Sequence, residues 1–215
     1  MSTPTAPIAA HFPHGWNKFY IRSKLNTDPL YQAVHAELAD SDLPLLDIGC
    51  GLGLLSFYLR ERGIAVPIHG LDYDTRKIAT AQQIGPRYPG LTFAAHDARG
   101  GLPGHFGNVT ILDILQFFTA AEQAELLAKA AARVAPGGKL VIRSGIAAPT
   151  NRFRFTVLCD WIARASFWMK AAPKHYPTEE SLRKAVEPLG LTGTFAPLWG
   201  RTPLNNYLIV FRRPG

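Results

Sequence analysis

"LLDIGCGLGLLSFYL", residues 45–59, is the stretch that decides the fold. Its first residues form a short apolar run typical of a buried strand, and a glycine-rich turn follows. The segment 54–63 then has the apolar periodicity of a helix that ends at Gly63. A strand, a glycine-rich turn and a helix in this order build a nucleotide-binding crevice in α/β proteins. The sequence therefore predicts a ligand that contains a nucleoside.

The spacing of the glycines excludes two classes of nucleotide site. A P-loop needs a lysine and a hydroxyl side chain after its glycines, but here the chain continues with residues 54–56, Leu-Leu-Ser. A dinucleotide turn has the pattern G-x-G-x-x-G, whose third glycine would fall at position 54, where Leu54 stands. The observed pattern is G-x-G-x-G, with Gly49, Gly51 and Gly53.

Two aspartates near this turn indicate which ligand it binds. Asp47 lies two residues before the first glycine, where a carboxylate would repel a pyrophosphate and attract a cation. Asp72, in the segment "HGLDYD" about 20 residues further on, has the place of the acid that binds ribose hydroxyls. S-adenosylmethionine has a ribose, an ammonium and a sulfonium, and no phosphate. The two acids therefore favour this cofactor.

Strands and helices alternate through the first two thirds of the chain, which predicts a doubly wound parallel sheet. A helix is also expected from Asp28, which is its N-cap candidate, and Thr75, Thr119 and Thr178 are expected to start three others. Asp74 is interpreted as a helix-start residue and not as a second ribose ligand. Five strands are expected at 43–49, 66–74, 91–98, 109–118 and 139–145, and a terminal hairpin at 191–200 and 205–213.

Five segments together resemble class I S-adenosylmethionine-dependent methyltransferases. "LLDIGCGLG", "GLDYD", "AHDA", "ILDILQFF" and "PGGKLVIRS" occur in the order seen in that family, over residues 43–145. The resemblance implies a doubly wound, seven-stranded, mostly parallel sheet of the Rossmann-like methyltransferase fold, with an antiparallel last strand and a helical cap. It implies an N-terminal cap segment at 1–42 and a methyltransferase domain at 43–215, with 147–177 as a lid insertion after the fifth strand.

The resemblance also implies roles for individual residues. Asp47 would organise the methionine amino group, Asp72 would hold the ribose, and Tyr73 would pack on the adenine. Asp97 would accept the adenine amino group, with a simple turn at His96-Asp97 as the alternative. The implied cofactor-binding residues are Asp47, Gly49, Cys50, Gly51, Gly53, Asp72, Tyr73, Asp97, Ala98 and Gln116. The product left after transfer would be S-adenosylhomocysteine.

Composition limits where the protein acts and what it meets. Two cysteines provide no disulfide framework, which favours a reducing, cytoplasmic compartment. The N-terminus lacks the pattern of a secretory signal, and no apolar run is long enough for a membrane-spanning helix. A net charge of +7 favours an acidic partner, although ordinary surface variation explains it equally well.

Two basic, aromatic segments, 14–31 and 151–177, are expected to surround the methyl acceptor. Aromatic walls suit a planar acceptor, and cations suit an anionic group or partner. An alternative is that the rings at 161–168 are core contacts and the charges are solvated. The candidate substrate residues are Arg22, Lys24, Trp161 and Tyr176, and the candidate catalytic residues are His35, His175 and Tyr20, each of which has a purely structural alternative.

The run "KLNTDPLYQAV" leading into residues 45–63 further resembles methyltransferases of bacterial aryl-polyene and xanthomonadin-type pigment clusters. That resemblance implies methylation of a small hydroxyaryl acceptor, carried on an acidic acyl carrier protein. The acceptor atom, the catalytic base and the oligomeric state are not determined by the sequence.

Other functions remain alternatives. The Asn/Asp-Pro-Pro-aromatic turn of amino-adenine DNA methyltransferases is absent after the fourth expected strand, as is the Pro-Cys nucleophile of cytosine enzymes and the acidic cluster of metal-dependent catechol enzymes. Nucleic acid is thus disfavoured as a substrate, with RNA retained as an alternative. A peripheral membrane protein that uses 152–170 as an interfacial helix is another. A non-catalytic cofactor-binding subunit is a third.

Overall fold

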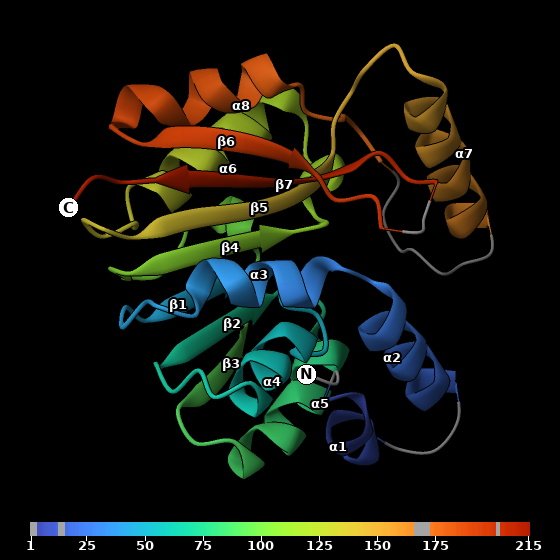
Figure 1. Cartoon of the computed structure of the whole chain (residues 1–215), viewed down its shortest axis with the longest axis vertical. Helices are drawn as coiled ribbons and strands as arrows, with labels where there is room; N and C mark the ends of the chain where they lie inside the picture. The colour runs from blue at the N-terminus through green and yellow to red at the C-terminus, as the bar shows by residue number, and fades with distance from the viewer. Residues whose placement is uncertain (1–3, 13–15, 166–172, 201–202) are drawn as a thin grey trace. The chain divides into compact units, whose positions relative to one another are not determined.

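The computed structural model describes residues 4–12, 16–165, 173–200 and 203–215, with side chains left out for 16–17 and 160–165. Its contacts divide the chain into two units, residues 1–100 and 101–215 (Figure 1). Each unit is described by itself below.

The chain forms a seven-stranded sheet with the strand order β3-β2-β1-β4-β5-β7-β6. In the first unit β2 pairs in parallel with both β1 and β3, and in the second unit β4 pairs in parallel with β5. The last strand, β7, is antiparallel to both of its neighbours, β5 and β6. The sequence-based fold class and the terminal hairpin are thereby confirmed. The strands are β1 Leu45–Ile48, β2 Ile68–Asp72, β3 Leu91–Ala95, β4 Asn108–Leu112, β5 Lys139–Gly145, β6 Thr192–Pro197 and β7 Asn206–Arg212.

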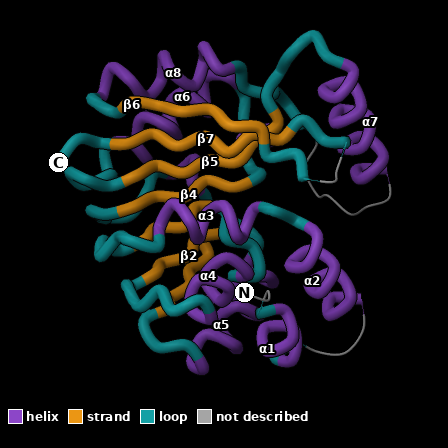
Figure 2. Tube along the Cα trace, in the orientation of Figure 1, coloured by secondary structure: helices purple, strands orange, loops and turns teal. Residues whose placement is uncertain are grey.

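Helices of the first unit pack on one another and on its three strands (Figure 2). Helix α1 contacts α2 and α4, α3 contacts α4, and α5 contacts β2 and β3. Phe57 of α4 is fully buried, and its ring contacts those of Phe12, Tyr88 and Phe93. The elements are α1 Thr5–Ala10, α2 Trp16–Thr27, α3 Leu30–Leu38, α4 Leu54–Glu61, α5 Thr75–Ile84, and the 3-10 turns η1 Gly85–Arg87 and η2 Ala98–Gly100.

Two predicted helix starts in this unit need correction. The helix expected from Asp28 begins at Leu30, whose N–H donates to Asp28 Oδ1 at 3.0 Å, and a separate helix, α2, precedes it. Thr75 is not the N-cap of α5. Asp74 holds that position in an extended conformation and accepts the N–H of Arg76 at 3.1 Å, because a cap residue must lie outside the helical region for its oxygen to reach back. The interpretation of Asp74 as a helix-start residue is confirmed.

Capping threonines start two helices of the second unit, as predicted. Thr119 forms a capping box with Glu122 on α6, and Thr178 forms one with Ser181 on α8. Helices α6 and α8 pack against each other, and α8 also contacts β6 (Figure 1). The helical elements are η3 Leu115–Phe117, α6 Ala120–Ala131, α7 Asn151–Ala165, α8 Glu179–Val186 and η4 Glu187–Leu189.

The fourth strand is shorter than the sequence suggested. The expected strand over 109–118 ends at Leu112, because Asp113 adopts a left-handed conformation with φ of 59° and a 3-10 turn follows. Within the part of the chain that is described, no helix has the length and apolar character needed to cross a bilayer.

Candidate cofactor site

The glycine-rich turn after β1 is held against the end of β2. The N–H groups of Gly49 and Cys50 both donate to the carbonyl oxygen of Leu71, at 2.7 and 2.9 Å. Gly49, Gly51 and Gly53 all have positive φ, a backbone conformation that costs any residue with a Cβ about 1–2 kcal/mol. The G-x-G-x-G spacing is therefore a requirement of the turn itself.

Asp72, the last residue of β2, fastens this turn with its side chain. One carboxylate oxygen, Oδ2, accepts the N–H of Gly51 at 2.8 Å, and the other, Oδ1, accepts the N–H of Asp74 at 2.8 Å. The residue is buried. Its charge is thus fixed at the mouth of the turn by two backbone donors, in a position from which its remaining lone pairs can accept further hydrogen bonds.

Gly53 has a packing role that sequence reasoning missed. A Cβ at this position would lie 2.8 Å from Cε1 of Phe93, on β3, and 3.3 Å from Cε2 of Phe57. The residue also precedes α4 with φ of 75°. This glycine therefore lets two core aromatic rings approach the backbone, in addition to any role toward a ligand.

The turn carries concentrated negative charge. Asp47 is 1% exposed on β1, and burial together with the charges of Asp47 and Asp72 raises the pKa of the Cys50 thiol well above its ordinary range, with Lys77 acting in the opposite direction. Both carboxylates are thus close enough to Cys50 to act on its ionisation. This electrostatic environment favours a cation and opposes a phosphate, as the sequence predicted.

The raised pKa makes Cys50 an unreactive thiol. We expect iodoacetamide to alkylate Cys50 at about pH 8 at least about tenfold more slowly than it alkylates glutathione, because only the thiolate is nucleophilic. Mass spectrometry of tryptic peptides from a Cys159→Ser variant would follow this reaction alone. Alkylation of Cys50 at the rate of glutathione would contradict the partly buried, negatively charged environment.

The remaining predicted residues of the first unit lie near the ends of β2 and β3. Tyr73 follows Asp72 directly and is 53% exposed, so its ring is available for stacking. Asp97 lies in a turn, as the alternative to its role as an adenine ligand had proposed. Its Oδ1 accepts the N–H of Arg99 at 3.0 Å and pairs with the Arg99 guanidinium at 3.2 Å. Ala98 begins η2.

In the second unit, a partly buried ion pair lies at the end of β4 and was not predicted. Arg143 of β5 is buried, and its Nε donates to Asp113 Oδ1 at 2.6 Å. Gln116 donates from Nε2 to the carbonyl oxygen of Asp113 at 3.0 Å, while its Oε1 is buried with no hydrogen-bond partner among the described residues. An arginine inside the apolar strand "KLVIRSG" was the available sequence signal.

The segment 174–176 is attached to the same place. The N–H groups of Lys174 and His175 donate to the carbonyl oxygen of Gln116 at 2.7 and 3.3 Å. The ring of Tyr176 meets that of Phe153, from α7, edge to face at 5.2 Å, and Tyr176 also lies beside Gly145 at the end of β5. The structure thus brings Gln116, His175 and Tyr176 together and adds Phe153, which sequence reasoning missed.

Other predicted residues take separate places. His35 lies in α3 with its ring edge-on to Tyr58 at 6.4 Å, a packing contact. On α2, the ammonium of Lys24 lies 5.9 Å from the ring of Tyr20, and Arg22 is exposed. The side chain of Trp161 lies outside the described residues.

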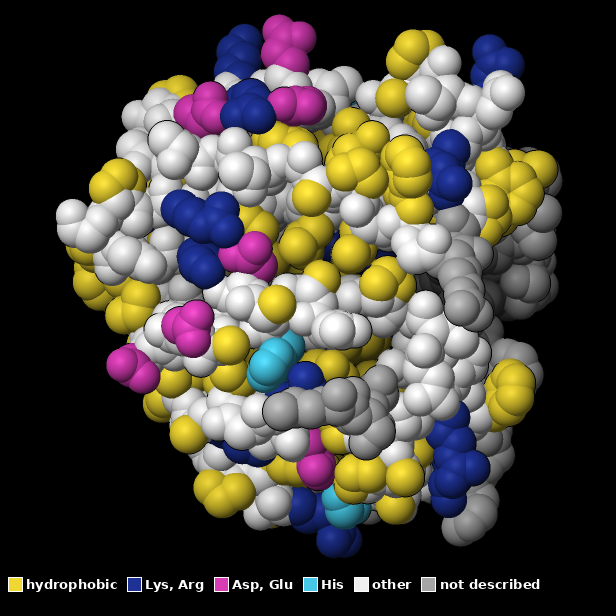
Figure 3. All heavy atoms as spheres, in the orientation of Figure 1, with side chains coloured by type: hydrophobic (Ala, Val, Ile, Leu, Met, Phe, Trp, Pro, Cys, Tyr) yellow, Lys and Arg dark blue, Asp and Glu magenta, His cyan; other side chains and the backbone are white. Residues whose placement is uncertain are grey.

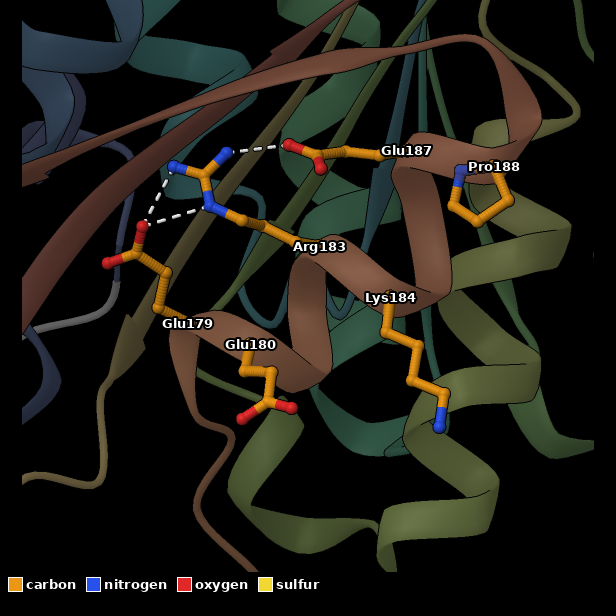
Figure 4. A pocket seen from close by; sticks show the side chains of 6 residues that line it. All are labelled: Glu179, Glu180, Arg183, Lys184, Glu187 and Pro188. Carbon is orange, nitrogen blue, oxygen red and sulfur yellow. Dashed lines mark hydrogen bonds and ion pairs between the residues drawn. The ribbon is translucent and has the colours of Figure 1, made fainter.

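An open depression on α8 contains none of these residues, and charged side chains that line it pair with one another. Arg183 pairs there with Glu179 at 2.8 Å and with Glu187 at 2.6 Å (Figure 4). Its guanidinium also lies 4.6 Å from the ring of Phe195. Because its cation is already satisfied, we assign no function to this depression. Among the residues whose side chains are described, no group of three His, Cys, Asp or Glu could hold a metal ion.

Comparison with known proteins identifies the domain. Residues 46–140 match the model of a family described as "Methyltransferase domain". No protein of curated function matches the chain in sequence. The match confirms the predicted methyltransferase class, and the solved structures that share the fold include ones with bound S-adenosylmethionine or S-adenosylhomocysteine.

Solved structures share the fold at low sequence identity. The magnesium protoporphyrin IX methyltransferase of Synechocystis PCC 6803, with bound S-adenosylhomocysteine, aligns with a TM-score of 0.70 and 18% identity over 98% of this chain and 95% of its own. The pyocyanin biosynthetic protein PhzM aligns at 0.69 and 16%, over 97% of this chain and 61% of its own. The N-methyltransferase NodS of Bradyrhizobium japonicum WM9 aligns at 0.62 and 19%, over 89% and 91%.

Proposed function

We propose that this protein transfers the methyl group of S-adenosylmethionine to a small hydroxyaryl acceptor. The observation that carries the cofactor half of the proposal is the fixed carboxylate of Asp72 at the mouth of a negatively charged glycine turn. The acceptor half rests on the second unit, where aromatic rings and an unused hydrogen-bond acceptor lie together.

In the cofactor half, Asp72 accepts hydrogen bonds from the ribose hydroxyls with the lone pairs that Gly51 and Asp74 leave free. Asp47 attracts the methionine ammonium, and the exposed ring of Tyr73 stacks on the adenine. Asp97 and Ala98, at the start of η2, border the adenine, and the charge of Asp97 is partly neutralised by Arg99.

In the acceptor half, Phe153 and Tyr176 provide an aromatic wall for a planar ring. Gln116 is held by Asp113 through its amide nitrogen, which leaves its Oε1 to accept a hydrogen bond from the acceptor hydroxyl. The sequence analysis gave Gln116 as a cofactor-binding residue, and we propose that it also contacts the acceptor. Structural neighbours that include an O-methyltransferase family protein of Burkholderia thailandensis are consistent with oxygen as the accepting atom.

The chemistry needs alignment more than a special catalyst. S-adenosylmethionine supplies an electrophilic methyl group on a sulfonium when it is bound. An in-line transfer requires only that the acceptor oxygen approach the methyl carbon opposite the sulfur and that water be excluded. The new carbon–oxygen bond forms as the carbon–sulfur bond breaks, and the hydroxyl proton leaves to a base. His175, whose side chain is exposed beside Tyr176, is the candidate base within the second unit.

The resemblance to pigment-cluster enzymes adds a second part to the proposal. A hydroxyaryl group carried as a thioester on an acyl carrier protein is an acidic macromolecular substrate, and the net charge of +7 suits such a partner. We therefore propose the carrier-bound form as the preferred form of the acceptor.

Calorimetry and methyl transfer test the proposal together. We expect S-adenosylhomocysteine to bind at least about 100-fold more tightly than NADH, because no phosphate is accommodated beside Asp47 and Asp72. We expect labelled methyl to pass from S-adenosylmethionine to 4-hydroxybenzoate, and faster to its carrier-bound thioester. Preferential NADH binding would contradict the cofactor assignment, and recovery of the label in RNA would contradict the acceptor class.

A further inference from the structure

Helix α7 has an outward face that the rest of the described chain does not cover. Phe155 is 41% exposed, Leu158 is 52% exposed and Val157 is 37% exposed. Phe155 and Leu158 share a helix face with the exposed residues Asn151 and Arg154, since residues three, four and seven apart align on a helix. Large exposed apolar side chains grouped in this way mark an interaction surface more often than isolated ones do.

The opposite face of α7 attaches the helix to the second unit. Thr156 is buried, and its Oγ1 accepts the N–H of Asn205 at 2.7 Å. The guanidinium of Arg152 lies 4.4 Å from the ring of Trp199, and Phe153 packs on Tyr176. These inner contacts attach α7 without using the exposed parts of Phe155, Val157 and Leu158, and the apolar character of those parts needs another explanation.

The charge around this face is positive. Arg154 is the cation of the outer face, residues 151–159 contain no acid, and the whole segment 151–177 has five Lys or Arg residues against the single acid Asp160. Figure 3 shows hydrophobic and Lys or Arg side chains at the surface around α7, at the right of the view. Apolar side chains flanked by cations are the composition of a helix that lies in the interface of an anionic bilayer.

A bilayer explains this combination better than an acidic protein does. An acidic protein would satisfy the arginines, but it would bury Phe155, Val157 and Leu158 only if it offered a complementary groove. A lipid surface needs no such shape, because acyl chains adapt to the side chains that enter them while the headgroups meet the guanidinium groups.

We propose that the outer face of α7, formed by Arg154, Phe155, Val157 and Leu158, docks the protein on an anionic lipid surface. The inference does not depend on which acceptor is methylated. It also leaves the proposed aromatic wall of the acceptor unused, because Phe153 lies on the inner side of the helix, where its ring packs on Tyr176.

Vesicle co-sedimentation tests this proposal. We expect the whole protein to pellet with vesicles of phosphatidylcholine and phosphatidylglycerol, and much less with phosphatidylcholine alone. The double variant Phe155→Ser/Leu158→Ser should bind the anionic vesicles at least about tenfold more weakly than the wild type. The reason is that two partly exposed apolar side chains can no longer enter the lipid. Phe106, which is 64% exposed in the same unit, provides a matched control, and Phe106→Ser should bind like the wild type.

Retained circular dichroism and S-adenosylhomocysteine binding would show that the double variant is folded, and Leu158→Ser alone would serve if it is not. Failure of the wild type to pellet with anionic vesicles would overturn the proposal, as would an equal loss in Phe106→Ser. Soluble polyglutamate provides the remaining arm. If it bound the protein as tightly as vesicles do, and lost binding in the same double variant, an acidic protein and not a membrane would be the partner.

Discussion

Asp72→Ala should lower the affinity for S-adenosylhomocysteine at least about 100-fold, because two hydrogen bonds to a charged group contribute about 1.5–3 kcal/mol each. The loss has two sources in the structure. The carboxylate that would accept the ribose hydroxyls disappears, and the N–H groups of Gly51 and Asp74 lose the oxygens that they donate to. Isothermal titration calorimetry measures the affinity, and urea unfolding should show a loss of about 2–4 kcal/mol for the two buried donors.

Asp74→Ala is the matched control for this substitution. Asp74 is also buried, two residues after Asp72, and its side chain caps α5 through the N–H of Arg76. Loss of such a cap costs about 1 kcal/mol of stability and should leave the affinity within about threefold of the wild type. A folded Asp72→Ala protein could instead bind S-adenosylhomocysteine as tightly as Asp74→Ala does. That result would show that Asp72 holds the glycine turn in place and does not bind the ligand.

Local signals in the sequence were sufficient for most of the fold. The strand 139–145 was predicted at the bounds of β5, since its apolar run is bounded by glycine on both sides. Thr119 and Thr178 were predicted as helix starts, because a capping box needs only residues three apart. Thr75 failed for the same local reason, since Asp74 beside it is also a good cap and its backbone conformation decided the competition.

Local sequence patterns could not predict contacts between segments that are distant in the chain. Nothing next to Asp113 in the sequence announces its left-handed conformation, and the Arg143 that pairs with it lies 30 residues away. His35 was predicted as a candidate base by residue type, and its ring contact with Tyr58 of another helix could not be read from the sequence. Roles of this kind depend on which side chains meet after folding, and one sequence does not show that.

Gly53→Ala should destabilise the protein by about 2–5 kcal/mol, the sum of a left-handed backbone penalty and overpacking against two rings. The added methyl group would lie 2.8 Å from Phe93 Cε1 and 3.3 Å from Phe57 Cε2, and both rings are buried. Since Phe57 starts the second turn of α4, the strain should be transmitted to the glycine turn and weaken cofactor binding as well. Urea unfolding with and without S-adenosylhomocysteine measures both effects.

Gly63→Ala separates the two contributions. Gly63 has φ of 88°, but a Cβ there would meet nothing within 4 Å, so only the backbone penalty of about 1–2 kcal/mol applies. The excess loss in Gly53→Ala over Gly63→Ala is then the cost of the ring contacts. In the Gly53→Ala background, Phe93→Leu should recover part of that excess loss of stability, because the smaller side chain makes room for the added methyl group. In the wild type the same substitution only removes core volume and should destabilise the protein. The two substitutions should therefore show a coupling energy of about 1–2 kcal/mol. Equal losses at the two glycines, with affinity reduced only at Gly53, would instead mean that the third glycine of the motif is needed for the ligand and not for Phe93.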